Sequence, residues 1–177
     1  KNKTEQLIKA QNDGNQIQSS NPDIIEKFQS ITGIDERKYV SSEVKSSDLA
    51  AIAAKKAIKD SNINQETLDY IIVAHNFGDI SCDSSQIDTL PSLSSRVKTI
   101  LKIKNPKCVA YDIICGCPGW VEGVIQAKSF IKSGMANKCL VIGSDTLSRV
   151  TDDNDRDSMI YADGSGAIIL ESNDSDD

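Results

Sequence analysis

The feature that most constrains this chain is the alternation of short apolar runs with segments of helical periodicity. Continuous apolar runs rich in β-branched residues predict four strands, at 70–74, 108–114, 138–143 and 167–171. Segments that repeat apolar residues at helical spacing predict helices at 23–30, 48–60, 92–103 and 119–133. Strand, helix, strand, helix, strand is typical of an α/β fold with a mostly parallel sheet and right-handed crossovers.

Capping residues bound the predicted helices. Ser46 or Ser47 is a suitable N-cap for the helix at 48–60, and Asn62 is a suitable left-handed stop. Gly33 ends the first predicted helix, and Gly134 ends the helix at 119–133. We therefore expect loops after each of these residues.

Composition excludes several classes of protein. The 177 residues are 38% hydrophobic and 26% charged, which suits one packed domain. A net charge of −6 argues against nucleic acid as a partner, because phosphate is held by surplus Lys and Arg. No apolar run approaches the roughly 20 residues of a membrane span, and no secretory signal opens the chain. We therefore expect a cytoplasmic protein whose five cysteines are reduced thiols, with no disulfide framework.

The most informative segment is the predicted corner between the strand at 108–114 and the helix at 119–133. Gly116 and Cys117 follow the strand, and Pro118 suits the first helical position, where its missing N–H costs nothing. The Cys117 sulfur would then face the first N–H groups of the helix, which stabilise a thiolate and lower its pKa. Residue types in this order favour an activated nucleophile.

Structural alternatives exist for each candidate. A free cysteine often behaves as a small buried hydrophobe, and Cys115 with Cys117 could suggest a metal pair. His75, the single histidine, closes the strand at 70–74, where a loop or core role is more common than that of a base. Residues 162–166 lack the spacing of a phosphate loop and precede a strand, so we expect a structural turn there.

Residues 31–171 resemble the N-terminal half of β-ketoacyl-acyl-carrier-protein synthase III, within the thiolase-like superfamily. The block around the corner, Asp112 to Trp120, resembles the nucleophile element D-x-x-x-x-C-[SAP]-G-[FW] of that family and assigns the nucleophile to Cys117, not Cys115. The other matching blocks, in order, are TGIDER at 32–37, SDLA at 47–50, DYIIVA at 69–74, GSDTLSR at 143–149, and DR at 155–156 with YADGSGA at 161–167.

The resemblance implies a fold, a reaction and partners. The fold would be the N-terminal half of a thiolase-like α/β fold, with helices on both faces of a mostly parallel mixed sheet. Cys117 would accept an acyl group from acyl-CoA, its own N–H forming part of the oxyanion hole, before decarboxylative Claisen condensation with malonyl-acyl-carrier protein in fatty acid biosynthesis. Arg156 matches an arginine that contacts the CoA phosphate, although a solvated loop charge is an equal alternative. The family is a homodimer and uses neither a metal nor another cofactor.

Departures from the family leave alternatives open. The histidine and asparagine that assist decarboxylation have no counterpart here, so we expect a fragment of a longer synthase. Its parts would be a polar, partly helical segment at 1–30, the nucleophile-bearing domain at 31–171 and an acidic tail at 172–177. Lys27 and Ile31 stand where the family has a CoA-clamping Trp and Arg. A non-catalytic thiolase-like partner subunit, a hydroxymethylglutaryl-CoA synthase or a type III polyketide synthase is the alternative function.

Overall fold

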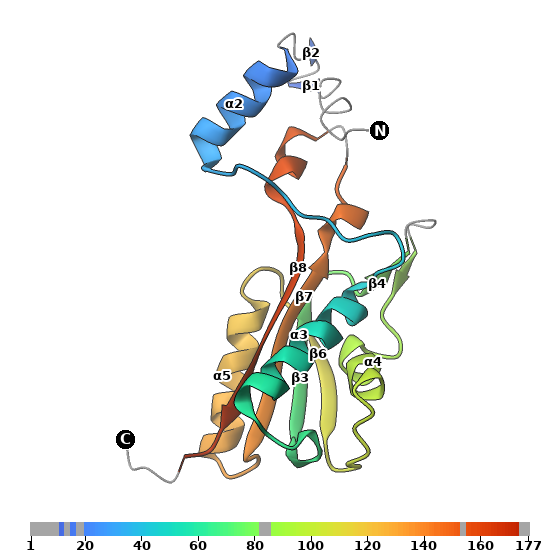
Figure 1. Cartoon of the computed structure of the whole chain (residues 1–177), viewed down its shortest axis with the longest axis vertical. Coiled ribbons are helices and arrows are strands. Elements are labelled where there is room, and N and C mark those ends of the chain that lie inside the picture. Colours follow the sequence, from blue (N-terminus) through green and yellow to red (C-terminus); the bar gives the residue numbers. More distant parts are fainter. Residues whose placement is uncertain (1–10, 13–14, 17–19, 82–85, 153–154, 174–177) are drawn as a thin grey trace. The chain divides into compact units, whose positions relative to one another are not determined.

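The computed structural model describes residues 11–12, 15–16, 20–81, 86–152 and 155–173. They fall into two compact units (Figure 1). One unit contains residues 41–146 and 164–177, and the other contains residues 1–40 and 147–163.

The first unit is built on a four-stranded sheet with the order β6-β3-β7-β8. Its elements in chain order are α3 (Ser46–Ser61), η1 (Gln65–Thr67), β3 (Tyr70–His75), β4 (Asp79–Ile80), β5 (Ile87–Asp88), α4 (Leu93–Ile100), β6 (Val109–Ile114), α5 (Gly119–Lys132), β7 (Lys138–Thr146) and β8 (Asp163–Glu171). Strand β8 belongs to this unit from residue 164 onward.

Three strands of this sheet are parallel, and the fourth is antiparallel. Tyr70 of β3 pairs with Val109 of β6 on one side and with Cys139 of β7 on the other, both in parallel register. The Ser165 hydroxyl donates to the Gly143 carbonyl at 2.9 Å, and the N–H of Ser172, just after β8, donates to the carbonyl of residue 137 at 2.8 Å. Residue numbers rise along β8 as they fall along β7 in these pairs, so the two strands are antiparallel.

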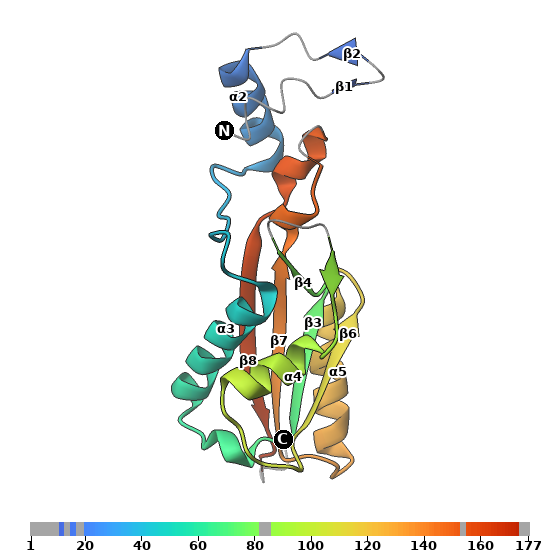
Figure 2. The same cartoon turned by 90° about the vertical axis from the view of Figure 1, so that its right-hand side faces the viewer.

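Helices cover both faces of the sheet (Figure 2). The chain leaves β3 for β6 through α4, then returns past β3 to β7 through α5. Right-handed crossovers in opposite directions place α4 and α5 on opposite faces. Alternate side chains of the central strand enter two separate cores: Ile71 and Val73 pack under α3 and α4, and Ile72 packs under α5.

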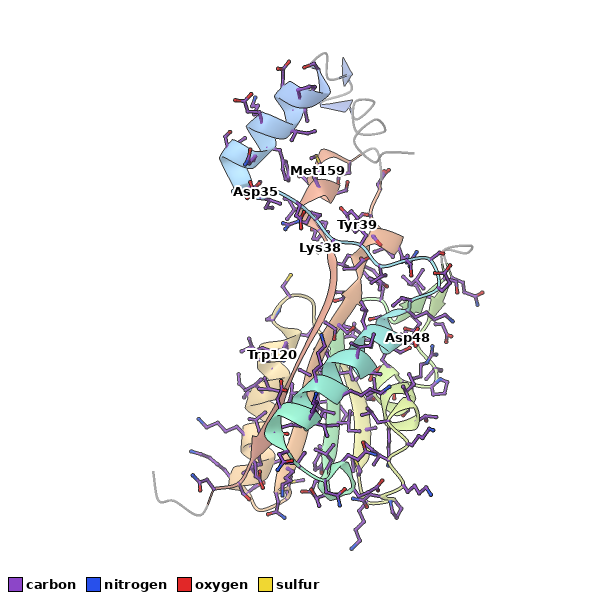
Figure 3. All side chains as sticks on the ribbon, in the orientation of Figure 1. Asp35, Lys38, Tyr39, Asp48, Trp120 and Met159 are labelled. Atoms are coloured by element: carbon purple, nitrogen blue, oxygen red, sulfur yellow. The ribbon has the colours of Figure 1, made fainter. Side chains whose placement is uncertain are left out.

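Small residues let α5 lie close to the sheet. A Cβ added at Gly123 would lie 2.9 Å from Cγ1 of Val141, and one at Gly119 would lie 3.2 Å from Cβ of Ala74. The Trp120 ring occupies the space above Gly143, where an added Cβ would meet its Cδ1 at 3.3 Å (Figure 3). The start of α5, next to the predicted corner, is therefore held firmly against β3 and β7.

The second unit contains α2 (Asn21–Thr32) with the short segments β1 (Gln11–Asn12), β2 (Asn15–Gln16), η2 (Leu147–Arg149) and η3 (Arg156–Ile160). Asp163 organises it, because its carboxylate accepts from the Val40 N–H at 3.0 Å and from the Ser148 N–H and hydroxyl at 2.9 and 2.6 Å. Its own N–H donates to the Lys38 carbonyl at 3.0 Å, and the Tyr39 hydroxyl donates to the Tyr161 carbonyl at 3.2 Å.

The predicted fold class and strands are confirmed, whereas two local predictions are wrong. The N-cap of α3 is Lys45, not Ser46 or Ser47, because both serine hydroxyls bond to other elements: Ser46 to the Ser144 carbonyl at 3.1 Å and Ser47 to the Asp79 carboxylate at 2.6 Å. Residues 163–166 are not a turn, because β8 begins at Asp163.

The predicted stops of three helices are confirmed by positive backbone angles. Asn62 caps α3 with φ of 52°, and Gly33 caps α2 with φ of 68°. Gly134, with φ of 75°, follows the C-cap Ser133 of α5. Among the described residues, no helix is long and apolar enough to cross a membrane.

Candidate active site

The predicted corner joins the end of β6 to the start of α5. The chain bends at Gly116, whose φ of 67° is left-handed and suits glycine, and the Gly119 N–H donates back to the Gly116 carbonyl at 3.0 Å. Pro118 lies one position earlier than predicted, as the N-cap of α5, with helical angles of −77° and −5°. The bend is therefore closed by its own backbone before the helix begins.

Cys117 stands at this bend with its side chain exposed. Its N–H donates to no other described residue. The N–H groups of Trp120 and Val121, in the first turn of α5, likewise lack an acceptor within the described chain, as expected at a helix start. An exposed thiol and unused donors therefore belong to the same helix start, where the positive end of the helix can stabilise negative charge.

The corner lies at the edge of the sheet where the parallel strands end. Asn76, the residue after β3, donates its N–H to Oδ1 of Asp145 at 2.9 Å and its side-chain amide to Oδ2 at 2.7 Å. The Asn76 amide oxygen therefore points away from that carboxylate, and a Cβ added at Gly116 would lie 3.7 Å from it. Asn76 thus links β3 to β7 beside the bend, at the sheet edge where ligands bind in open α/β folds.

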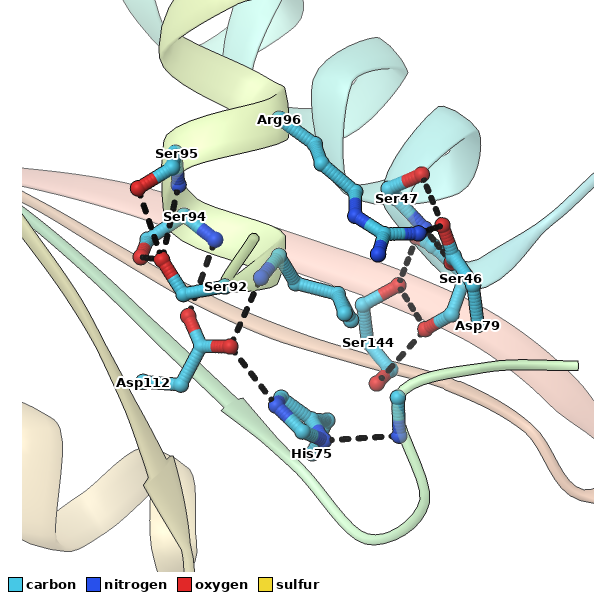
Figure 4. Close-up of polar contacts among 12 residues, drawn as sticks. Ser46, Ser47, His75, Asp79, Ser92, Ser94, Ser95, Arg96, Asp112 and Ser144 are labelled. Atoms are coloured by element: carbon cyan, nitrogen blue, oxygen red, sulfur yellow. Dashed lines mark hydrogen bonds and ion pairs between the residues drawn. The ribbon is translucent and has the colours of Figure 1, made fainter. Parts of the chain in front are cut away.

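Asp112 lies on β6, three residues before Cys115. Its side chain joins this strand to β3 and to the start of α4 (Figure 4). Its carboxylate accepts from the N–H groups of Leu93 and Ser94, at 2.7 and 2.8 Å, and from His75 Nε2 at 2.9 Å. The Gly78 N–H donates to His75 Nδ1 at 3.0 Å, so the ring proton lies on Nε2. Burial raises the pKa of Asp112, but hydrogen bonds from His75 and Ser94 outweigh it and hold that pKa below its usual value.

A second ionic cluster fixes the start of α3 to α4 (Figure 4). Buried Asp79 accepts from the Ser47 N–H at 2.8 Å and from Arg96 Nη1 at 2.7 Å. Arg96 Nη2 also lies 2.6 Å from exposed Asp88, and this hydrogen bond lowers the pKa of Asp88 and raises that of Arg96. The cluster contacts neither Cys117 nor the bend and is structural.

The cysteines that the structure describes divide into two kinds. Cys115 and Cys117 are exposed, whereas Cys108 and Cys139 are buried. Burial raises the pKa of the Cys108 thiol and raises that of Cys139 to about 11. The described residues hold no group of three or more metal-ligating side chains, and Cys82 lies outside them.

The structure brings together only part of the predicted site. Arg156 begins η3 in the other unit, and its side chain is outside the description. His75 is a buried core residue, as one of the alternatives for it predicted. Sequence reasoning missed the Asn76–Asp145 pair and the anchoring role of Asp112. Asp112 lies in the matched nucleophile block, but nothing in the sequence signals that Asn76 and Asp145, 69 positions apart, are in contact.

Parallel strands with helices on both faces, and a cysteine where strand meets helix at their carboxyl edge, make this an α/β fold of the kind seen in thiolase-like enzymes. Within that class the chain is similar to β-ketoacyl-acyl-carrier-protein synthase III. The sequence profile of 3-oxoacyl-[acyl-carrier-protein] synthase III matches residues 111–177, which include the corner.

Sequence relatives of that name are more than a third identical to this chain over the aligned residues. The β-ketoacyl-[acyl-carrier-protein] synthase III of Neisseria gonorrhoeae is 39% identical over 144 residues, which are 81% of this chain and 42% of the relative. That of Ehrlichia ruminantium is 38% identical over 143 residues, 80% of this chain and 42% of the relative. The chain therefore spans less than half the length of these relatives.

Solved structures agree. The 3-oxoacyl-[acyl-carrier-protein] synthase III of Aquifex aeolicus superposes with a TM-score of 0.72 at 32% identity, over 84% of this chain and 46% of that one. The enzyme of Thermus thermophilus gives 0.71 at 29% identity, over 87% and 47%. A priming β-ketosynthase from a polyketide pathway gives 0.74 at 20% identity over 89% and 43%, a likeness of fold alone.

Proposed function

We propose that this chain carries the acyl-accepting part of a 3-oxoacyl-acyl-carrier-protein synthase III-like acyltransferase, with Cys117 as the nucleophile. The observation that carries the proposal is the exposed Cys117 thiol at the bend before α5, beside N–H groups that no described residue occupies. The match of the synthase III profile to residues 111–177 supports it, because the corner lies inside that match.

The proposed half-reaction is acyl transfer from acyl-CoA to Cys117. The thiolate attacks the thioester carbonyl, and the negative charge of the tetrahedral intermediate falls on the former carbonyl oxygen. The N–H of Cys117 donates to that oxygen as one part of the oxyanion hole. Collapse of the intermediate breaks the bond to the CoA sulfur, which leaves as a thiolate and takes a proton from water, and Cys117 keeps the acyl group as a thioester.

The remaining steps are proposed from the similarity to the longer synthase III relatives. Malonyl-acyl-carrier protein would lose carbon dioxide and condense with the acyl group in fatty acid biosynthesis, in a homodimer and in the cytoplasm, where thiols stay reduced. Arg156 is proposed to bind the CoA phosphate. A priming β-ketosynthase from a polyketide pathway shares the fold at 20% identity, against 29% and 32% for the two synthase III structures superposed in the same way.

Mass spectrometry of the acylated chain tests the proposal. After incubation with acetyl-CoA and with longer acyl-CoAs, we expect one hydroxylamine-labile acyl group on the peptide that contains Cys117. Cys117→Ala should abolish the adduct, and Cys115→Ser should retain it. An adduct on another cysteine, or none on Cys117, would contradict the assignment and favour a non-catalytic thiolase-like partner subunit.

A further inference from the structure

We propose that Cys115 and Cys117 form a redox pair, in which Cys115 resolves oxidised Cys117 as an intrachain disulfide that thiols reopen. The inference deepens the proposed function, because the oxidant acts on the same sulfur that would accept the acyl group. Disulfide formation needs no acyl transfer, so the two proposals can fail independently.

The first observation is the distribution of thiols. Of the four cysteines that the structure describes, the two exposed ones are both at the bend and are separated by a single glycine. The other two are buried in the sheet, and burial raises the pKa of each thiol, that of Cys139 to about 11. Thiolate is the form that reacts with oxidants, so burial leaves Cys108 and Cys139 inert and concentrates reactivity at the bend.

The second observation is the backbone between the two thiols. Residues two apart in an extended strand have Cα atoms roughly 6.7 Å apart, close to the upper limit of about 6.8 Å for a disulfide. Here the chain does not continue as a strand: it bends at Gly116, whose φ is 67°. A bend shortens the span below the extended value, and glycine can adjust its backbone further at little cost.

The surroundings of the bend leave room beside Gly116, the residue between the two thiols. Apart from the two cysteines themselves, the nearest atoms to a Cβ added at Gly116 would be Asn76 Oδ1 at 3.7 Å and Pro118 Cδ at 4.0 Å, which are ordinary contact distances. A Cβ added at Gly119 would lie 3.6 Å from Cβ of Cys115, which places Cys115 against the first turn of α5. Both cysteines thus flank the start of α5, and Gly116 between them is the residue whose backbone would adjust on ring closure.

The chemistry balances with a hydroperoxide as oxidant. The Cys117 thiolate attacks the outer peroxide oxygen, the O–O bond breaks, and Cys117 becomes a sulfenic acid while an alcohol or water leaves. The Cys115 thiolate then attacks the Cys117 sulfur, the S–O bond breaks, and hydroxide leaves and is protonated to water. Two equivalents of an external thiol return both cysteines to the reduced state.

The pair would protect the nucleophile as well as switch it off. A sulfenic acid that meets no thiol proceeds to sulfinic acid, which ordinary thiols do not reduce. A disulfide between residues two apart closes a small, strained and exposed ring, which is the labile kind that thiols reduce readily. Oxidation would therefore stop acyl transfer reversibly, because the sulfur that attacks the thioester is engaged in the ring.

The test compares the reduced chain with its Cys115→Ser and Cys82→Ser variants after exposure to hydrogen peroxide. Cleavage after Tyr111 separates Cys108 from the pair, so a loss of two hydrogens in the following peptide identifies the disulfide. We expect that loss in the parent chain and in Cys82→Ser, with full recovery of thiols after dithiothreitol. We expect Cys115→Ser to accumulate about five-fold more Cys117 sulfinic acid than the parent.

Three outcomes would overturn the inference: Cys117 joined to Cys82 or to a second chain, equal sulfinic acid in the parent and in Cys115→Ser, or no disulfide in the folded parent. Far-UV circular dichroism of each variant before oxidation verifies the fold, and Cys115→Ser changes an exposed side chain only. A chain that forms the disulfide but accepts no acyl group from acyl-CoA would retain the redox pair and overturn the proposed function.

Discussion

The Nε2 atom of His75 lies 2.9 Å from Oδ2 of Asp112, and this buried contact joins the central strand β3 to the strand that carries the nucleophile corner. The same carboxylate accepts from two N–H groups at the start of α4. One side chain therefore serves three donors from two other elements. The Asp112 side chain therefore fixes the position of β6, and hence of the bend at Gly116, relative to β3 and α4.

Asp112→Asn should destabilise the chain at pH 7. The amide keeps one oxygen and turns its NH₂ toward a donor, so a buried N–H loses its acceptor, and we expect a loss of about 2–4 kcal/mol in the free energy of unfolding. Asp60→Asn is the matched control because Asp60 is exposed near the end of α3. Urea unfolding of both variants measures the difference.

The pH dependence of this loss checks its cause. The pKa of Asp112 lies below its ordinary value of 3.8 in the fold, so its contribution is complete above that value. It is lost as the pH falls through the lower pKa of the folded state. The stability gap between the parent and Asp112→Asn should therefore be constant above about pH 5 and narrow toward pH 3. A gap that is unchanged at acid pH would contradict the assigned role of the charge.

Asp79 and Asp88 bind the same arginine but should differ in energetic weight. The Asp79 side chain is 2% exposed and also accepts two hydrogen bonds from Ser47, whereas that of Asp88 is 53% exposed. We expect Asp79→Ala to cost about 3 kcal/mol, because it leaves buried donors without an acceptor, and Asp88→Ala to cost less than about 1 kcal/mol. Thermal unfolding of both variants measures the two costs. Equal losses of stability would show that the exposure of the carboxylate does not determine its contribution.

Local sequence patterns predicted those parts of the fold that depend on local physics. Continuous β-branched runs identify buried parallel strands because both faces of such strands are covered. Positive-φ stops such as Asn62 are recognisable because few residues adopt that conformation. The corner at Cys117 could be placed because a strand end, a glycine and a proline occur together in the sequence.

Apart from the one-position shift of Pro118, the errors and omissions involve partners distant in sequence. Ser46 and Ser47 are good N-caps in isolation, but Ser144 and Asp79 engage their hydroxyls in the fold. Residues 163–166 form a strand although they include two glycines, because pairing with β7 decides the strand there. The link between Asn76 and Asp145 is likewise invisible until β3 and β7 are placed side by side.

Gly123→Ala should loosen α5 from the sheet. The added methyl would lie 2.9 Å from Cγ1 of Val141 and 3.5 Å from Cγ2 of Ile72, both in the core, so we expect a loss of about 1–3 kcal/mol. Gly166→Ala is the control, because nothing lies within 4 Å of its added Cβ and its φ is not positive. Urea denaturation midpoints measure both. Equal midpoints would mean that the helix can shift without cost.

Selective alkylation tests whether the start of α5 activates Cys117. With limiting iodoacetamide near pH 6.5, we expect Cys117 to react first, because the helix dipole and unused N–H groups favour its thiolate. Cys115 is the comparison, because it shares the exposure but precedes the bend and the first turn of α5. Buried Cys139, whose pKa is raised to about 11, should remain unmodified until the chain is unfolded. Equal rates at Cys115 and Cys117 would show that the corner exposes the sulfur without activating it, and the acyl-accepting role would then need another source of reactivity.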